Sequence, residues 1–292
     1  MHGIRREKTD DGRNQEHANV DSIEHPAAWN LPQSNVKIGV YLLGDCRVLV
    51  ASKLLDGLTR RKTGDLLAFL LVNRQRKLHR NVIAKSLWPN CADARRYLRQ
   101  TIWQLHKALK PAERAGMAPI LRANEDDHPT VELPSDALLD ADLLQHAEAQ
   151  ALRSELALRH LDGLCRVTEL YAGPFLEGRD ELWVTLERAR LENSYFQLVD
   201  ALMKACIHTK QWARALELGM TALQHDIARE STHRLVMHAY SGAGNRLAAL
   251  RQYRICADAL YNEFGAAPER SSRVMFEKLQ RDDAILLDAR AS

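Results

Sequence analysis

Features typical of secreted, disulfide-stabilised and membrane proteins are scarce in this sequence. Its 292 residues include five cysteines, which are widely spaced and form no C-x-x-C pair. An odd, scattered set argues against a disulfide framework and against a cysteine zinc site. The longest wholly apolar run, residues 66–72, is seven residues long, far below the ~20 needed to span a bilayer. Because the first residues also lack the apolar stretch of a signal peptide, we expect a cytoplasmic protein with reduced thiols.

Residue patterns that indicate enzymes are missing as well. The sequence has no G-x-x-x-x-G-K-[ST] phosphate loop and no H-E-x-x-H zinc motif. The stretch GAGNRL at 242–247 lacks the third glycine of a dinucleotide-binding loop. His225, His233 and His238 are spaced eight and five residues apart, so no neighbouring pair shares a helix face. We therefore expect no enzymatic activity, no metal and no cofactor.

Negative charge is scarce in one part of the chain. Residues 36–135 hold eighteen Lys and Arg against nine Asp and Glu, and residues 36–114 hold seventeen against five. The flanking parts are mildly acidic, with a net charge of −2 for residues 1–35 and −4 for residues 136–292. A compact basic segment is typical of nucleic-acid-binding domains, because it attracts the phosphate backbone whatever the base sequence.

The elements expected in residues 36–135 follow the order of a winged helix-turn-helix. Two short strands around a turn at Gly44 come first. Three helices and a hairpin follow, at residues 63–73, 79–89, 93–110 and 119–134. Thr63 is expected to cap the first helix, with Arg80 or Asn81 near the start of the second. In this fold the third helix lies in the major groove of DNA.

The third of these helices has an unusual charge pattern. Four apolar residues follow one another at spacings of four, three and four, which places them on one face: Leu98, Ile102, Leu105 and Leu109. The remaining surface carries Arg95, Arg96, Arg99, Gln100, Gln104, His106 and Lys107. No acidic residue follows Asp93 within residues 93–110. Exposed helices usually mix the two signs, because opposite charges one turn apart stabilise the helix. A face of one sign therefore indicates an anionic partner.

From about residue 137 the strand signals stop and helical patterns continue to the C-terminus. Residues 201–226 align with residues 235–260 at an offset of 34, which pairs Ala205 with Ala239. A 34-residue period with small residues at matching positions is typical of tetratricopeptide repeats, in which stacked helix pairs bury a shared core.

The expected fold class is therefore mostly α, with an α+β winged helix followed by an all-α, tetratricopeptide-like domain. The four expected parts are a disordered tail at 1–35, the winged helix-turn-helix DNA-binding domain at 36–135, the helical-repeat domain at 140–280 and a C-terminal tail at 281–292.

Candidate DNA contacts follow from this arrangement, since cations at helix starts or on the outward face of the third helix can reach phosphates or base edges. They are Arg60, Arg61, Lys62, Arg80, Arg95, Arg96, Arg99, Gln100, Trp103, Lys107 and Arg122. For Trp103, packing against the hairpin or the first helix is an equally good interpretation. The hairpin tip is acidic at residues 125–127. Either Arg122 or His128 contacts DNA while the tip points away, or the tip contacts a protein.

Several stretches resemble the SARP-type bacterial transcriptional activators. In the N-terminal half they are DLLAFLLVNRQRKLHRNVIAKSLWPN and YLRQTIWQLHKAL, where Leu87-Trp88-Pro89 and Leu98-Arg99 fit the family pattern. Tyr97, Gln100 and Trp103 replace the commoner Asn, Arg and Ser. In the C-terminal half they are LYAGPFLEGRDELWVTLERARLE, WARALELGMTAL and AALRQYRICADALYNEFGAAPE, with Phe264 in place of the usual Leu.

The resemblance covers about residues 36–280 and carries expectations of its own. It implies a response-regulator-type winged helix joined to a bacterial transcriptional activator domain. It further implies a sequence-specific activator that binds promoter DNA as a homodimer on direct repeats and contacts RNA polymerase. The departures at Tyr97, Gln100 and Trp103 concern base preference and not the fold.

Two other functions are compatible with the same residues. A helical-repeat scaffold would bind an acidic protein or RNA through its basic domain. A helical-repeat receptor would bind a phosphate-containing small ligand through its arginines, and this activity would be compatible with DNA binding. Competition with duplex DNA separates the scaffold from a DNA-binding regulator.

Overall fold

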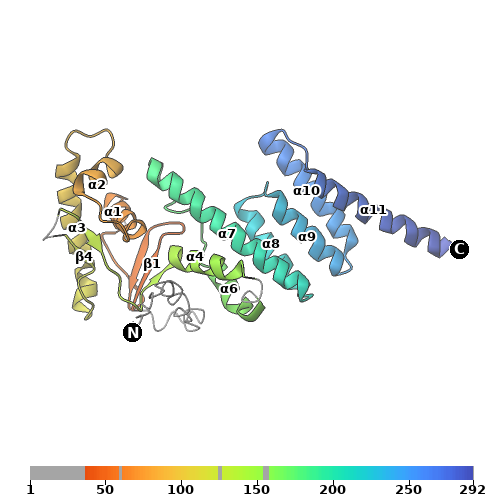
Figure 1. The fold of residues 1–292 in the computed structure, drawn as a ribbon, viewed down its shortest axis with the longest axis horizontal. Coiled ribbons are helices and arrows are strands. Elements are labelled where there is room, and N and C mark those ends of the chain that lie inside the picture. The colour runs from red at the N-terminus through yellow and green to blue at the C-terminus, as the bar shows by residue number, and fades with distance from the viewer. Residues whose placement is uncertain (1–36, 59–60, 124–126, 154–157, 292) are drawn as a thin grey trace, which may run out of the picture.

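The computed structural model describes residues 37–58, 61–123, 127–153 and 158–291. The tail expected at residues 1–35 and the candidate Arg60 lie outside the described residues. Figure 1 shows a mixed α/β part at the N-terminal end, followed by a row of helices that extends to the C-terminus. The mostly helical architecture predicted from the sequence, a winged helix followed by an all-helical part, is confirmed.

A four-stranded sheet opens the N-terminal half. It contains β1 (Ile38–Tyr41), β2 (Arg47–Val50), β3 (Lys53–Leu54) and β6 (Leu138–Leu139), in the order β3-β2-β1-β6. β1 and β2 are antiparallel, and Gly44 supplies a positive φ of 102° at the turn between them. β6 joins β1 in parallel from almost 100 residues away along the chain. The sequence did not predict β3 or β6, because two-residue strands show no periodicity.

Three helices and a short hairpin complete the winged helix. They are α1 (Arg61–Val72), α2 (Arg80–Leu87), α3 (Ala94–Arg114), β4 (Leu121–Arg122) and β5 (Thr130–Val131). All five lie within or beside the predicted segments. α1 begins earlier than predicted, so Thr63 is buried inside the helix and does not cap it. The cap of α2 is His79, whose Nδ1 accepts a hydrogen bond from the Asn81 N–H at 3.2 Å.

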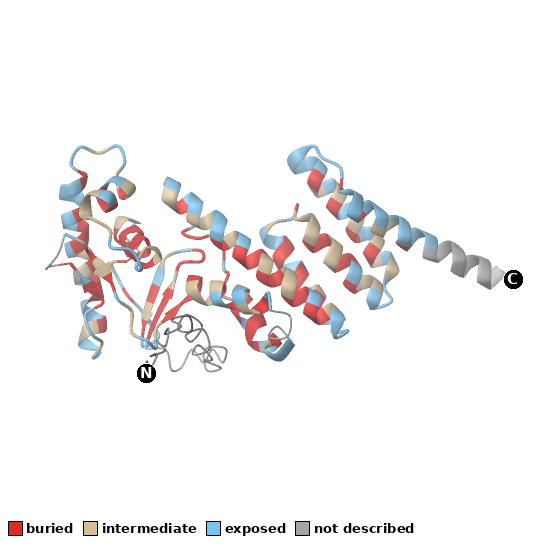
Figure 2. Ribbon diagram, in the orientation of Figure 1, coloured by how far each residue is buried: buried red, intermediate tan, exposed pale blue. Residues whose placement is uncertain are grey.

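The C-terminal half is built of helices joined by loops. Its helices are α4 (Asp140–Ala151), α6 (Leu161–Thr168), α7 (Leu182–His208), α8 (Trp212–His225), α9 (Glu230–Gly242), α10 (Arg246–Phe264) and α11 (Arg270–Ala291). Helices α7 to α11 pack in sequence order, and α4 and α6 pack against α7. Figure 2 shows buried residues along the sides where these helices meet. α11 runs through residues 281–291, the stretch that we assigned to a tail.

The 34-residue offset corresponds to a repeated geometry. Ala205 and Ala239, which the offset pairs, are both buried. Lys210 and Gly244, also paired by it, lie two residues after the last residues of α7 and α9 and have positive φ values of 58° and 78°. This left-handed conformation ends a helix sharply and is strained for a lysine. A Cβ atom at position 219 would lie 2.5 Å from Val236 Cγ2. Gly219 therefore allows α8 to approach α9 closely.

The two halves are joined by more than a peptide linker. Asp140, the first residue of α4, accepts hydrogen bonds from the Leu42 and Leu43 amides at 2.7 and 2.8 Å. Residues 173–177, here called the strap, lie beside the turn after β1. There the Leu176 amide donates to the Leu42 carbonyl at 3.0 Å. Since β6 and Asp140 follow residue 135, a fragment ending at 135 would lack both contacts with β1 and its turn.

Candidate nucleic-acid interface

α3 presents two different faces, as the spacing of its residues predicts. Its four inward residues, Leu98, Ile102, Leu105 and Leu109, are at most 9% exposed. They hold α3 to the body of the winged helix, where the helix packs against α1 and α2. The outward face carries the exposed side chains of Arg95, Arg96, Arg99, Gln100, Trp103, Lys107 and Lys110. Within α3 the first acidic side chain is that of Glu113.

Most cations of this outward face have no carboxylate beside them. Within the described residues Arg96, Arg99 and Lys107 form no ion pair. Arg95 donates a hydrogen bond from Nε to the Asn81 side-chain oxygen of α2. The resulting surface carries exposed positive charge. An anion can bind there without first breaking an internal salt bridge.

Trp103 lies in the middle of this surface and is 62% exposed. Lys107 Nζ lies 5.5 Å from the centre of its indole ring, within the range of a cation–π contact. The alternative that Trp103 packs into the domain against the hairpin or α1 is therefore wrong. Its ring instead gives the basic face an apolar surface on which a base or sugar can pack.

The basic surface continues beyond the residues singled out from the sequence. A shallow groove on the C-terminal half of α3 is lined by Trp103, His106, Lys107, Lys110, Pro111 and Arg114. The predicted helix ended at residue 110, before Pro111, whereas α3 continues to Arg114. Lys107, Lys110 and Arg114 recur at helical spacing, which is the signal that could have extended the site.

The hairpin contributes less free charge than predicted. Arg122 Nη2 lies 2.8 Å from Glu132 Oε2, and both side chains are exposed. The Arg80 amide donates to the Asp127 carbonyl at 2.9 Å, and Arg80 Nε lies 3.3 Å from the Asp127 carboxylate. Asp127 therefore turns back onto the start of α2, while residues 124–126 lie outside the described residues. Arg80 and Arg122 remain predicted DNA contacts, each with an acidic neighbour.

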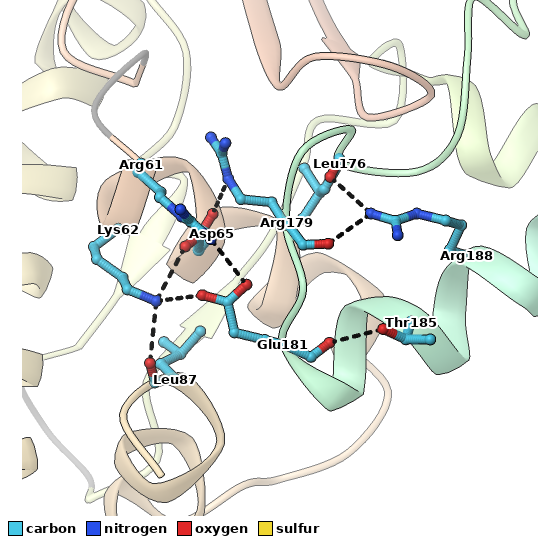
Figure 3. Close-up of polar contacts among 9 residues, drawn as sticks. All are labelled: Arg61, Lys62, Asp65, Leu87, Leu176, Arg179, Glu181, Thr185 and Arg188. Carbon is cyan, nitrogen blue, oxygen red and sulfur yellow. Dashed lines mark hydrogen bonds and ion pairs between the residues drawn. The ribbon is translucent and has the colours of Figure 1, made fainter. Parts of the chain in front are cut away.

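Arg61 and Lys62, at the start of α1, contact the helical half (Figure 3). Lys62 Nζ lies 2.6 Å from Oε1 of Glu181, the residue before α7, and 3.2 Å from the Leu87 carbonyl oxygen at the end of α2. Arg61 Nη2 lies 3.6 Å from Glu181 Oε2. Because these cations lie at a helix start, we expected them to contact a DNA phosphate. In the structure the carboxylate of Glu181 lies beside them. Arg61 and Lys62 remain untested as DNA contacts.

A buried carboxylate completes this group of charges. Asp65 is 1% exposed, and its Oδ1 lies 3.0 Å from Arg179 Nε while its Oδ2 lies 3.4 Å from Lys62 Nζ. Burial raises the pKa of Asp65, although Arg179 and Lys62 oppose the shift. We call Arg61, Lys62, Asp65, Arg179 and Glu181 the junction cluster. Sequence reasoning missed it, because residues 61–65 and residues 179–181 lie more than 100 positions apart along the chain.

At the junction, burial and the neighbouring cations have opposite effects on the pKa values of the carboxylates. Burial of Glu181 works against its charge, yet the hydrogen bond from Lys62 helps to hold the pKa of Glu181 below its ordinary value. The Arg188 guanidinium donates to the carbonyls of Leu176 and Arg179 at 3.1 and 2.8 Å, which ties the strap to α7 (Figure 3). Within the cluster the carboxylate of Asp65 is buried, so removing one of its cationic partners would leave a poorly compensated charge.

Other kinds of site find little support in the described part of the chain. No group of three or more His, Cys, Asp or Glu side chains there is arranged to hold a metal ion. No helix among the described residues is long and apolar enough to cross a membrane. The five cysteines are free thiols, and burial raises the pKa of Cys46 and Cys256 to about 12, which suppresses thiolate chemistry.

Comparisons with known proteins agree with this architecture. Residues 137–280 match the family model of the bacterial transcriptional activator domain, a family of transcriptional activators and not a class of enzyme. A search of curated proteins finds no match. A solved structure of Mycobacterium tuberculosis EmbR in complex with a low-affinity phosphopeptide is similar, with a TM-score of 0.66 and 22% identity. The similarity covers 84% of this chain and 65% of the EmbR chain, and at this identity it establishes the fold.

Proposed function

We propose that this chain is a SARP-type transcriptional regulator, which binds promoter DNA through the outward face of α3 and activates transcription by contacting RNA polymerase. The observation that carries the proposal is the division of α3. Four buried apolar residues anchor the helix, and exposed Arg96, Arg99 and Lys107 face outward without a carboxylate among the described residues. A regulator of this type acts on the chromosome, so a cytoplasmic location belongs to the same proposal.

Because α3 is long, its two halves contact different parts of the DNA in this proposal. Its 21 residues span about 31 Å, whereas the major groove is about 12 Å wide. The N-terminal half therefore enters the groove, where Arg99 can pair bidentately with a guanine edge and Gln100 with an adenine. The C-terminal half, with Lys107, Lys110 and Arg114, lies over flanking phosphates, which fix orientation and carry no sequence information.

The helical half supplies protein contacts in this proposal. Its stacked helices offer a large surface for a second copy of the chain and for RNA polymerase. A dimer would hold two winged helices on sites about one helical turn, roughly 34–36 Å, apart. Linkage would then raise apparent affinity through effective concentration. The full chain should bind a two-site probe cooperatively and a one-site probe weakly.

The test is a selection from random duplex DNA with the full chain, followed by competition. Enrichment of a defined motif, with binding displaced by that duplex and not by duplex RNA or poly-aspartate, supports the DNA-binding regulator. Equal displacement by all three polyanions contradicts it and favours the scaffold alternative. A thermal-shift screen with nucleotides at millimolar concentration addresses the alternative of a receptor for a phosphate-containing small ligand.

A further inference from the structure

Lys62 lies where three elements of the structure meet. It belongs to α1, and its ammonium contacts Glu181 beside α7 at 2.6 Å, the Leu87 carbonyl of α2 at 3.2 Å and Asp65 of α1 at 3.4 Å. Its side chain is 33% exposed, and that of Glu181 is 15% exposed. Figure 3 shows the ammonium pointing into this cluster between the end of α2 and the start of α7.

These contacts are of two kinds. Lys62 Nζ donates hydrogen bonds to Glu181 Oε1 and to the Leu87 carbonyl, and it forms an ion pair with Asp65 Oδ2 at 3.4 Å that is not a hydrogen bond. A shift of the ammonium toward a DNA phosphate would lengthen these contacts. The bond to Glu181 joins two charged groups in a partly buried environment, where charge-assisted hydrogen bonds are strong.

The position of the partners gives the contact a direction. Leu87 is the last residue of α2, where the exposed carbonyls carry partial negative charge and favour a cation. Glu181 directly precedes α7, at the end where the helix dipole favours an anion. Lys62 therefore joins the negative end of α2 to the acidic start of α7 and fixes the distance between these helices.

The connection extends from α2 to the start of α3. Trp88 follows Leu87, and Lys62 Nζ lies 5.9 Å from the centre of its ring. Trp88 in turn stacks on Tyr97 in the first turns of α3, with ring centroids 6.4 Å apart and an interplanar angle of 27°. Tyr97 precedes Leu98 and Arg99, so this contact chain reaches the end of α3 that would read bases.

We propose that Lys62 is a positioning residue for DNA recognition, which bridges α7 and the end of α2 and thereby sets the orientation of the start of α3. In this role Lys62 does not touch the DNA. The inference rests on the proposed function and assigns part of its specificity to the junction between the two halves. It also replaces the simpler expectation that a lysine at a helix start binds phosphate.

The test compares Lys62→Met and Glu181→Gln in the full chain. The probes are the duplex that the wild-type chain enriches from a random pool and an unrelated duplex of the same length. We expect Lys62→Met to lower affinity for the enriched duplex about fivefold, within the range of coupling between contacting residues. Affinity for the unrelated duplex and the slope of log K against log salt should stay at wild-type values. Glu181→Gln should weaken binding in the same way, and the double variant should be no weaker than Lys62→Met.

Glu181→Gln keeps the proposal falsifiable if Lys62→Met folds poorly, because it changes one oxygen to a nitrogen. Tighter DNA binding by Glu181→Gln would show that Glu181 withholds Lys62 from phosphate, and would overturn the proposal. A slope flattened by about one in Lys62→Met would overturn it too, since that is the signature of a lost phosphate contact. Unchanged affinity in both variants would equally contradict a positioning role.

A matched control removes the same charge elsewhere. Lys204 is exposed on α7, far along the helix from Glu181, and Lys204→Met should leave both affinities unchanged. An equal loss in Lys204→Met would attribute the effect to net charge and overturn the proposal. Failure of the proposed function looks different, because the wild-type chain itself would then enrich no duplex and show no salt-dependent binding.

Discussion

The outward face of α3 and the junction cluster are both rich in Arg and Lys, but they differ in what stands beside each cation. On α3, Arg96, Arg99 and Lys107 have no carboxylate partner among the described residues. At the junction, Arg61, Lys62 and Arg179 share the carboxylates of Asp65 and Glu181. The first set is available to an external anion, whereas the second forms ion pairs that link two parts of the chain.

The comparison changes how the basic N-terminal segment is interpreted. Seventeen basic residues against five acidic ones in residues 36–114 indicate a nucleic-acid footprint. Part of that excess is neutralised by acidic residues from outside the segment, such as Glu181 and Asp142, which pairs with Arg74. Local charge counts therefore overestimate the charge that faces a partner, because they omit carboxylates that folding brings in from elsewhere.

The largest effect is expected when the junction cluster is opened at its buried carboxylate. Arg179→Ala leaves Asp65, 1% exposed, with Lys62 as its remaining cation. We expect the free energy of unfolding to fall by about 3 kcal/mol at neutral pH, measured by urea denaturation of the full chain. Arg281→Ala breaks an exposed pair with Glu277 and should cost less than about 0.5 kcal/mol. Equal losses in the two variants would contradict a structural role for the cluster.

The next effect concerns the outward face, where the same kind of truncation should spare the fold and impair DNA binding. Arg99→Ala should cost about 1–3 kcal/mol of binding free energy and relax preference at one base position. Its urea midpoint should match wild type, because Arg99 is exposed. Arg254→Ala on the exposed side of α10 serves as the control. A selection that returns the wild-type motif with wild-type affinity would remove Arg99 from the interface.

Lys107 should show a smaller and less selective effect. It lies two turns beyond Arg99, over the predicted phosphate path, so Lys107→Ala should weaken binding to all duplexes alike. The slope of log K against log salt should flatten by about one. Electrophoretic mobility shifts on the enriched and the unrelated duplex, across a salt series, provide the measurement. Loss confined to the enriched duplex would instead place Lys107 on a base.

The smallest expected effect lies in the helical half, away from both charged regions. His233 is fully buried, and its Nδ1 and Nε2 contact Gln252 Nε2 and the Ile227 carbonyl at 2.7 and 2.8 Å. Burial lowers the pKa of His233 below 6.5, so its stabilising effect is complete above pH 6.5. It declines as pH falls from 6.5 toward the folded-state pKa, because the unfolded chain binds the proton first.

His233→Gln tests this effect through the difference from wild type. The wild-type advantage in unfolding free energy should shrink by about 1 kcal/mol or less between pH 7 and pH 5. The comparison with wild type is needed because protonation of Asp140 changes the free energy of unfolding of both proteins in the opposite direction. Burial raises the pKa of Asp140 to about 6, so its contribution favours the folded state as pH falls. A wild-type advantage that does not vary with pH would contradict the neutral, buried state of His233.

Local pattern predicted most of the fold. The spacing of Leu98, Ile102, Leu105 and Leu109 located α3 and its buried face, and the repeat located the stacked helices. Short strands such as β6 were not predictable, because two residues carry no period and their partner lies far away in sequence. The end of α3 was placed too early, because the expected helix stopped at residue 110 whereas α3 continues through Pro111 to Arg114.

The candidate site was predictable where it depends on one helix and unpredictable where it depends on tertiary contacts. Arg99, Gln100 and Lys107 were singled out from helical periodicity, and the structure exposes them together. For Lys62 the local sequence indicates only a cation at a helix start. Its partner Glu181 is 119 residues away, and nothing in the pattern around either residue connects the two.

The most direct test of the central claim is the salt dependence of DNA binding by the full chain. If the outward face of α3 and its extension neutralise about five phosphates, log K against log salt should fall with a slope of roughly −4 to −5. The measurement uses the enriched duplex over a salt series at fixed pH. A slope near zero would contradict the claim that the unpaired cations of α3 bind a nucleic-acid backbone.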